Sequence, residues 1–92
     1  MDFEWDTRKA AQNIAKHDVP FEYATRVFLD PNRLDVEDSR RDYTEQRRIT
    51  LGNVDGRVFL VAYTPRGAMI LLISARMANP PEQRQYYETL PS

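Results

Sequence analysis

The chain has 92 residues, the length of one small domain, and we expect residues 1–92 to fold as a single unit. It has no cysteine, which excludes disulfides and thiol chemistry, and its single histidine disfavours a histidine-rich metal site. Thirteen Lys and Arg residues face 14 Asp and Glu residues, so composition disfavours a broad phosphate-binding surface but allows a local basic cluster. We expect neither a metal nor another cofactor.

Nothing in the hydropathy pattern predicts a targeting or membrane segment. The first ten residues carry acidic side chains and no apolar run, unlike a secretory signal. The longest apolar run, residues 68–74, is far too short to span a bilayer. We therefore expect a cytoplasmic protein without a membrane partner.

The N-terminal third is predicted to form a short strand and two helices. Phe3–Trp5 is predicted as an edge strand, and Asp6 is a typical N-cap for a helix that runs to about His17. The apolar stripe of this helix is narrow: Ala10, Ala11 and Ile14. One polar side carries residues about one turn apart: Lys9, Asn13 and Lys16. Pro20 suits the first turn of a second helix, which Asp30-Pro31 ends.

The rest of the chain is predicted to form an antiparallel meander and a last helix. Apolar residues, alternating or continuous, predict strands over Leu34–Val36, Arg47–Leu51, Val58–Thr64 and Met69–Arg76. Asp55-Gly56 and Pro65-Arg66-Gly67 are typical turn sequences, and residues 37–45 are predicted as a charged loop. Asn79 then precedes a helix over roughly Pro81–Thr89. This order predicts an α+β fold: an antiparallel sheet of about four to five strands with two N-terminal helices and one C-terminal helix.

Four groups of residues along nearly the whole chain match a known family in order and spacing. The first group is Phe3-Glu4-Trp5-Asp6 with Lys9, Asn13, Lys16-His17, Val19 and Phe21. The second is Glu45 and Arg47 with Leu51-Gly52, and the third is Val61-Ala62-Tyr63-Thr64. The fourth is Ile73-Ser74-Ala75-Arg76 with Ala78, Glu82 and Tyr86. Together they resemble the BrnT toxins, which are relatives of the RelE-type ribonucleases.

This resemblance implies a compact RelE-like fold and a bacterial toxin of a type II toxin–antitoxin module. The toxin would be a metal-independent endoribonuclease that cleaves RNA and so inhibits translation. Its implied partner is a BrnA-like ribbon-helix-helix antitoxin, which would neutralise the toxin and supply the contacts of the complex with promoter DNA.

The chain departs from the family pattern at three positions, two in its last predicted strand and one just after it. Many members carry basic residues where this chain has Met69, Leu71 and Met77. The departure supports a second hypothesis, a catalytically weak homologue that acts mainly as a protein-binding co-repressor of its antitoxin. A stand-alone interaction module is a third. Adjacency to a gene for a ribbon-helix-helix protein would separate the first two hypotheses from the third.

Metal-free RNA cleavage needs a base, an acid and fixed positive charge at the phosphate. For the charge we rank Arg76 first, since it ends an apolar strand before a turn and matches the family's Ser-Ala-Arg sequence; a solvated strand-end arginine is the alternative. Arg47 falls on the family arginine and should share a sheet face with Ile49, whereas Arg48 should face the other way. The alternative for Arg47 is a surface salt bridge with Glu45.

The acid or base is predicted from the one residue type that titrates near neutral pH, which is histidine. His17 is therefore a catalytic candidate, and equally a C-terminal helix cap, where positive charge is favourable. Lys16 and Lys9 could add positive charge for RNA or form a solvated helix face. Tyr63 could stack on RNA bases, although its alternation with Phe59 favours packing in the core.

The strand that contains Met69 and Leu71 is apolar on both faces. These two residues alternate with Ile70 and Leu72, so the two pairs lie on opposite faces of the sheet. An open Met69/Leu71 face would be a contact surface for the antitoxin or a second copy, whereas a face covered by a helix would be core.

Overall fold

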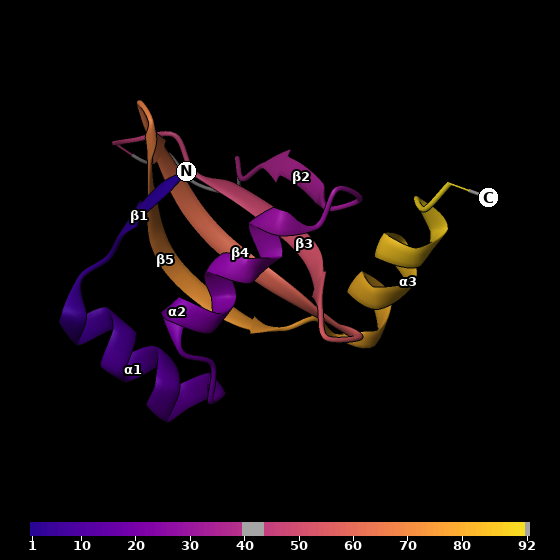
Figure 1. The fold of residues 1–92 in the computed structure, drawn as a ribbon, viewed down its shortest axis with the longest axis horizontal. Coiled ribbons are helices and arrows are strands. Elements are labelled where there is room, and N and C mark those ends of the chain that lie inside the picture. The colour runs from indigo at the N-terminus through magenta and orange to yellow at the C-terminus, as the bar shows by residue number, and fades with distance from the viewer. Residues whose placement is uncertain (40–43, 92) are drawn as a thin grey trace.

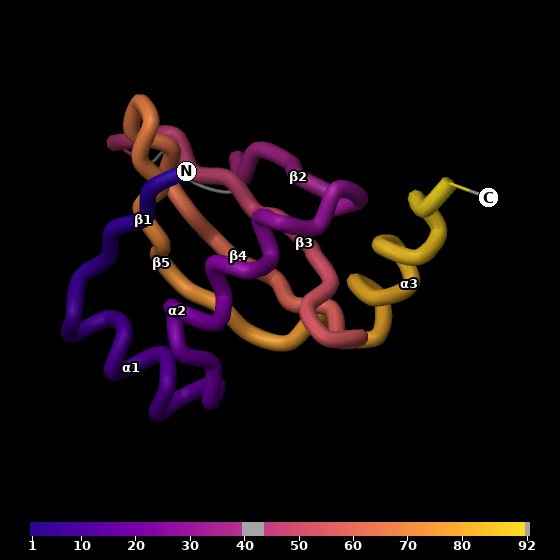
Figure 2. Tube along the Cα trace, viewed as in Figure 1, coloured from indigo at the N-terminus to yellow at the C-terminus, as the bar shows by residue number. Residues whose placement is uncertain are grey.

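The computed structural model describes residues 1–39 and 44–91, and its centre is a five-stranded sheet (Figure 1). Four strands form the predicted antiparallel meander: β2 (Leu34–Glu37), β3 (Arg48–Val54), β4 (Arg57–Arg66) and β5 (Met69–Met77). The N-terminal strand β1 (Asp2–Glu4) adds to the other edge, parallel to β5, and Figure 2 shows the two running side by side. The strand order is β1-β5-β4-β3-β2, so the predicted α+β class is confirmed. The predicted loop over residues 37–45 lies partly outside the described residues.

The sequence predicts one of the two hairpin turns of the meander correctly and misplaces the other. The predicted Asp55-Gly56 turn is confirmed, with φ of +54° and +86° at these residues, as the tightest hairpin turns require. The predicted turn at Pro65-Arg66-Gly67 is wrong, because β4 continues to Arg66 and the turn is Gly67-Ala68. Pro65 fits inside β4 because the pairing of β4 with β3 ends at Tyr63, so one side of the strand no longer needs an N–H donor there.

The first predicted helix is confirmed as α1 (Thr7–His17), and the side chain of Asp6 accepts from the N–H groups of Arg8 and Lys9. The predicted faces of α1 are wrong: Ile14 is 45% exposed, whereas Asn13 is buried. The Asn13 amide donates to the carbonyls of Val19 and Ala75 at 2.9 Å and accepts from the Ala75 N–H at 3.0 Å. A polar side chain therefore anchors α1 to β5, which a search for apolar stripes cannot detect.

The second predicted helix is shorter than the apolar spacing indicates. Pro20 is the N-cap residue and not part of the first turn, and α2 covers only Phe21–Ala24. The chain then tightens into the 3₁₀ segment η1 (Thr25–Leu29), which ends at Asp30 as predicted. η1 can pack closely against β3 because Gly52 has no side chain. A Cβ at this position would lie 2.5 Å from the Cγ1 of Val27.

The last helix, α3 (Pro80–Glu88), begins one residue before the predicted start and ends one residue before the predicted end. Its N-cap is Asn79, and Glu82 completes a capping box. Tyr86 ties α3 to the rest of the fold, because its buried hydroxyl donates to Asp30, which also accepts from the N–H of Asn53 at 2.8 Å. No helix in the described parts of the chain is long and apolar enough to cross a membrane.

The sheet has two unequally covered faces. On one face α1, α2 and η1 cover the larger core, whose fully buried members include Phe21, Val27, Val61 and Leu72. On the other face α3 covers a smaller cluster that consists of Leu51, Val58, Ala78 and Tyr86. Figure 1 shows α3 standing apart from the other helices, near one end of the sheet. The α3 face is therefore only partly covered, and Met69 and Leu71 are half-buried on it.

Candidate functional site

Arg76 lies on β5 just before the strand ends, and its side chain is fixed on the α3 face of the sheet. Its guanidinium binds both carboxylate oxygens of Glu82: Nη1 lies 2.8 Å from Oε1 and Nη2 lies 2.9 Å from Oε2. Nη1 also donates to the carbonyl oxygen of Met77 at 3.2 Å. The Arg76 side chain is still 36% exposed, so a preorganised guanidinium reaches the protein surface.

Glu82 is placed against Arg76 by the start of α3. The Asn79 N–H donates to Oε1 of Glu82 at 2.9 Å, while the Asn79 side chain accepts from the Glu82 N–H at 3.0 Å. One carboxylate thus caps α3 and orients Arg76. Hydrogen bonds from the Arg76 guanidinium and from the Asn79 backbone hold the pKa of Glu82 below its usual value, although burial acts in the opposite direction.

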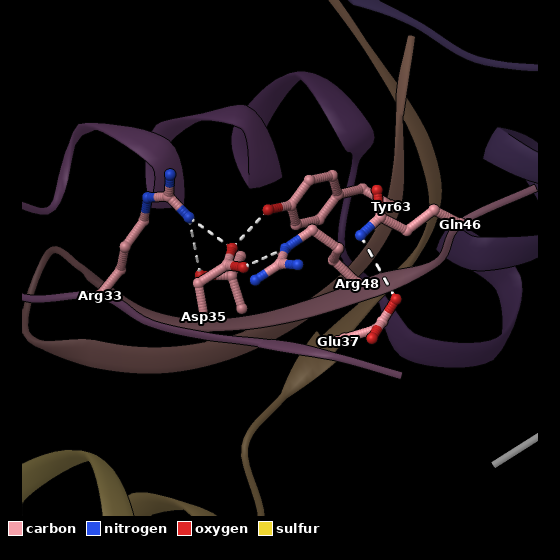
Figure 3. A network of polar contacts seen from close by, with 7 residues as sticks. Arg33, Asp35, Glu37, Gln46, Arg48 and Tyr63 are labelled. Atoms are coloured by element: carbon pink, nitrogen blue, oxygen red, sulfur yellow. Dashed lines mark hydrogen bonds and ion pairs between the residues drawn. The ribbon is translucent and has the colours of Figure 1, made fainter. Parts of the chain in front are cut away.

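A second polar group, which we call the Asp35 cluster, consists of Arg33, Asp35, Arg48 and Tyr63 (Figure 3). Oδ2 of Asp35 accepts from Nη1 of Arg33 at 2.6 Å, and Oδ1 accepts from Nε of Arg48 at 2.6 Å. The Tyr63 hydroxyl donates to the same Oδ2. Nη1 of Arg33 also donates to the hydroxyl of buried Thr50 at 3.2 Å. Both oxygens of this carboxylate therefore accept hydrogen bonds within one compact network.

Strand register explains why these residues meet. Asp35 of β2 pairs with Thr50 of β3, two residues from Arg48, and Arg48 in turn pairs with Tyr63 of β4. Side chains two residues apart on a strand share a sheet face, so all of them lie on the face that carries η1. The cluster thus occupies that face at the end of the sheet where β3 begins.

Tyr63, a predicted RNA-binding residue, is enclosed by this cluster. It is only 5% exposed, and its ring packs edge-on against Phe28 with ring centroids 5.0 Å apart. Burial, together with the hydrogen bond to Asp35, raises the pKa of Tyr63, so the phenol stays protonated at neutral pH. This placement favours core packing over stacking on a base.

Arg47 lies directly before β3 and is half-buried, and its carbonyl oxygen accepts from the Asp38 N–H at 2.8 Å. Glu45, the predicted salt-bridge partner of Arg47, binds Arg66 with Nη2–Oε1 and Nε–Oε2 distances of 2.8 and 2.9 Å. That contact, together with the contact of Arg66 to Glu4, places the 45–48 segment beside the β4–β5 hairpin.

His17 is the last residue of α1 and is half-buried. The C-cap is the next residue, Asp18, whose φ is +58° and whose N–H donates to the carbonyl of Ile14. His17 lines a hollow of about 280 Å³ together with Arg57, Phe59 and Met77. The hollow lies at the end of β5 and contains neither of the predicted catalytic arginines. The predicted RNA-binding residues of the same helix are both exposed: Lys9 and Lys16.

The structure does not bring the three predicted catalytic residues into one cluster. Arg76 lies across from Leu60 and, beyond it, from Leu51, which is four residues along β3 from Arg47. At the usual rise of a strand this separates Arg76 and Arg47 by about 13 Å along the sheet. His17 belongs to a helix on the other face.

Sequence reasoning missed Arg33 and Asp35, and it set Arg48 aside in favour of Arg47. The available signal was alternation, which places Asp35 on the face opposite Leu34 and Val36 and Arg48 on the face opposite Ile49. The pairing of β2 with β3 was needed to bring these charges together, and a sequence alone does not fix that register. Among the residues that the structure describes, no three His, Cys, Asp or Glu side chains gather as metal ligands would.

Comparison with known protein families gives a match over most of the chain. A protein-family model described as a ribonuclease toxin, BrnT, of a type II toxin-antitoxin system matches residues 5–82. This range includes all strands from β2 to β5, both arginine sites and Glu82. No curated protein matches the chain.

Proposed function

Because the chain belongs to the BrnT family of ribonuclease toxins of type II toxin-antitoxin systems, we propose that it cleaves RNA itself. In this proposal it is a cytoplasmic bacterial endoribonuclease with a RelE-like fold that needs no metal ion and inhibits translation. The observation that carries the proposal is the guanidinium of Arg76, held by Glu82 at the end of β5 while still 36% exposed.

The reaction that suits fixed positive charge is attack of a ribose 2′-hydroxyl on the adjacent phosphorus atom. The bond from phosphorus to the 5′-oxygen breaks, which leaves a 2′,3′-cyclic phosphate and a 5′-hydroxyl, and one proton moves from the attacking to the leaving oxygen. Arg76 would stabilise the negative charge that builds on the phosphate oxygens, for which a planar guanidinium is well shaped.

The other predicted residues would act at a distance from Arg76. Arg47, about 13 Å along the sheet, would contact a second phosphate of the same strand. His17 would move a proton only where RNA passes around the end of β5, since Met77 separates its hollow from Arg76. Lys16 and Lys9, both exposed on α1, would add positive charge.

The test is cleavage of single-stranded RNA by the purified protein in the presence of EDTA. Arg76→Ala should lower the cleavage rate about a hundredfold, the usual loss when one preorganised charge contact to a transition state is removed. Arg26→Ala is the matched control, because it also deletes an arginine from an ion pair, here with Asp55 at 3.0 Å. Equal rates for wild type and a folded Arg76→Ala protein would contradict the proposal.

The family also implies an antitoxin partner, which we propose is a BrnA-like ribbon-helix-helix protein that alone contacts promoter DNA. It would bind the α3 face, where Val36 is 47% exposed and an apolar groove runs between β2, β3 and α3. Backbone hydrogen exchange of the complex should show protection in β2 and β5. Protection confined to α1 would contradict this placement.

A second candidate function is a weak enzyme that acts mainly as co-repressor of its antitoxin. Two observations favour it: the apolar residues at Met69, Leu71 and Met77, and the carboxylate of Glu82 that already occupies Arg76. The same cleavage assay distinguishes the two candidates, since a co-repressor would bind the antitoxin tightly and leave RNA intact.

A further inference from the structure

We propose that Arg33 and Arg48 form a binding site for a backbone phosphate of single-stranded RNA, separate from Arg76. The choice of RNA rests on the proposed function, whereas the anion site itself rests on the geometry of the Asp35 cluster. Both guanidinium groups bind one carboxylate and flank it from either side, near the start of β3 (Figure 3).

Both arginines have guanidinium N–H groups for which no hydrogen bond within the described residues is seen. Within residues 1–39 and 44–91, Arg33 donates through Nη1 alone, whereas Arg48 donates to Asp35 through Nε and also interacts with the Tyr63 hydroxyl. No buried side-chain nitrogen or oxygen of the described residues lacks a hydrogen-bond partner. The remaining guanidinium nitrogens of both residues are therefore open to solvent, which agrees with side-chain exposures of 26% and 28%.

The site is held in place before any ligand binds. The guanidinium of Arg33 stacks on the ring of Phe28, 5.0 Å from its centroid, and its Nη1 is fixed by Asp35 and Thr50. The Tyr63 hydroxyl fixes the carboxylate from the third side. Two long side chains thus lose little conformational entropy on binding, which is what makes arginine forks effective phosphate ligands.

The two guanidinium groups of the cluster attract an anion, and the acids around them oppose it. Two guanidinium groups face the single carboxylate of Asp35, and Tyr63 stays neutral because burial and Asp35 raise its pKa. Two further acids lie nearby: Asp30, which interacts electrostatically with Arg33, and Glu37, which pairs with Arg48 in the strand register and whose carboxylate accepts from Nε2 of Gln46 at 3.4 Å. A phosphate would therefore meet two guanidinium groups, with Asp30 and Glu37 opposing it.

The position of the site fits a strand of RNA. Arg48 directly follows Arg47, and the two residues leave opposite faces of β3 at the same end of the sheet. RNA that contacts Arg47 could thus place a neighbouring phosphate on Arg48 and Arg33 across the β2 edge. Arg48 would then add to the binding of RNA without touching the bond that is cut.

The test measures binding without cleavage. The probe is a short single-stranded 2′-O-methyl RNA, which lacks the attacking hydroxyl, and its Kd is measured at several salt concentrations. Arg33→Ala and Arg48→Ala should each weaken binding about tenfold and lower the salt slope by about one. Arg26→Ala, at the opposite hairpin, should change the Kd less than about twofold, and Glu37→Gln should tighten binding.

Two further variants keep the test decisive if an alanine variant does not fold. Arg33→Lys and Arg48→Lys keep the charge but remove the planar fork, so we expect weaker binding with a nearly unchanged salt slope. Binding by folded alanine or lysine variants that equals the Arg26→Ala control would overturn the site. A parallel titration with inorganic phosphate should shift the Nε signals of both arginines; absence of any shift would restrict the ligand to RNA.

Failure of this site and failure of the proposed function can be told apart. A protein that leaves unmodified RNA intact, yet loses oligonucleotide affinity on Arg48→Ala, would keep the phosphate site and reject the ribonuclease. Cleavage of unmodified RNA, together with an oligonucleotide affinity that Arg48→Ala leaves unchanged, would keep the ribonuclease and reject the phosphate site.

Discussion

Glu82 links the proposed catalytic arginine to folding through a single carboxylate. It orients Arg76 and it completes the capping box that begins α3. A change at this residue therefore alters both the helix start and the position of the guanidinium, and its titration reports on both.

We predict that the stabilising effect of Glu82 depends on pH. Its pKa is lowered in the folded protein, mainly by Arg76, so the stabilisation is fully present above the unfolded-state pKa and is lost as pH falls through the folded-state pKa. The difference in unfolding free energy between wild type and Glu82→Gln should therefore shrink from about pH 6 to about pH 3. A constant difference in denaturant titrations across that range would show that ionisation of Glu82 does not stabilise the fold.

His17 gives a prediction about the reaction. If it moves the proton, His17→Ala should lower cleavage and flatten the pH–rate profile near neutrality, because histidine is the side chain that changes charge there. Lys16→Ala, next to it on α1, is the control for loss of nearby positive charge. An unchanged profile shape would make His17 structural.

For single residues, the sequence predicts the face on which a side chain lies better than it predicts which side chain it contacts. Alternation places Tyr63 in the core, where the structure has it, although Tyr63 is also a candidate for stacking on RNA, and it turns Arg48 away from Arg47. The contact of Arg76 with Glu82 joins residues six positions apart across a turn, and that of Asp35 with Arg48 joins residues of two strands. Such contacts depend on the tertiary fold, and residue patterns along the chain carry little of that information.

At the element scale, α3 is attached by few contacts, of which the Tyr86 hydroxyl on Asp30 is central. We predict that Tyr86→Phe costs about 1.5 kcal/mol, the range for a hydrogen bond to a charged group, and lowers Tm by several degrees. Tyr87→Phe, on a ring that is 49% exposed, should change Tm little. Equal Tm values for wild type and Tyr86→Phe would mean that α3 is held by packing alone.

The open part of the α3 face gives a second prediction at this scale. Leu71 is half-buried and lies beside Glu4 of β1 in the strand register. Leu71→Arg should therefore fold, because the new charge can reach both solvent and Glu4, and it should strengthen RNA binding in a salt-dependent way. A collapse of Tm would identify this face as core, since an unpaired buried charge is severely destabilising.

Elements with strong local signals were predictable, and those with tertiary causes were not. The N-cap Asp6, the Asp55-Gly56 turn and all four meander strands follow from local chemistry. The hairpin at Gly67-Ala68 was misplaced because Pro65 is a turn former that an unpaired strand side can also accept. The buried face of α1 was misassigned because Asn13, a polar residue, makes the contact with β5.

At the scale of the whole molecule, the sheet separates two groups of arginines. The Asp35 cluster lies on the η1 face where β3 begins, whereas Arg76 lies on the α3 face where β5 ends. RNA that contacts both must cross the sheet, and a protein bound to the α3 face would cover Arg76 while leaving Arg33 accessible. Toxin inhibited by its antitoxin should thus lose cleavage before it loses all affinity for RNA.

We propose that this chain stops bacterial growth by cutting RNA with Arg76. The most direct measurement is induction of the wild-type chain and of Arg76→Ala in bacteria without antitoxin, with sequencing of new 5′-hydroxyl RNA ends. We predict growth arrest and abundant new ends for wild type, and near-normal growth with few ends for an equally abundant Arg76→Ala protein. Equal arrest by both proteins, or arrest without new ends, would contradict the claim.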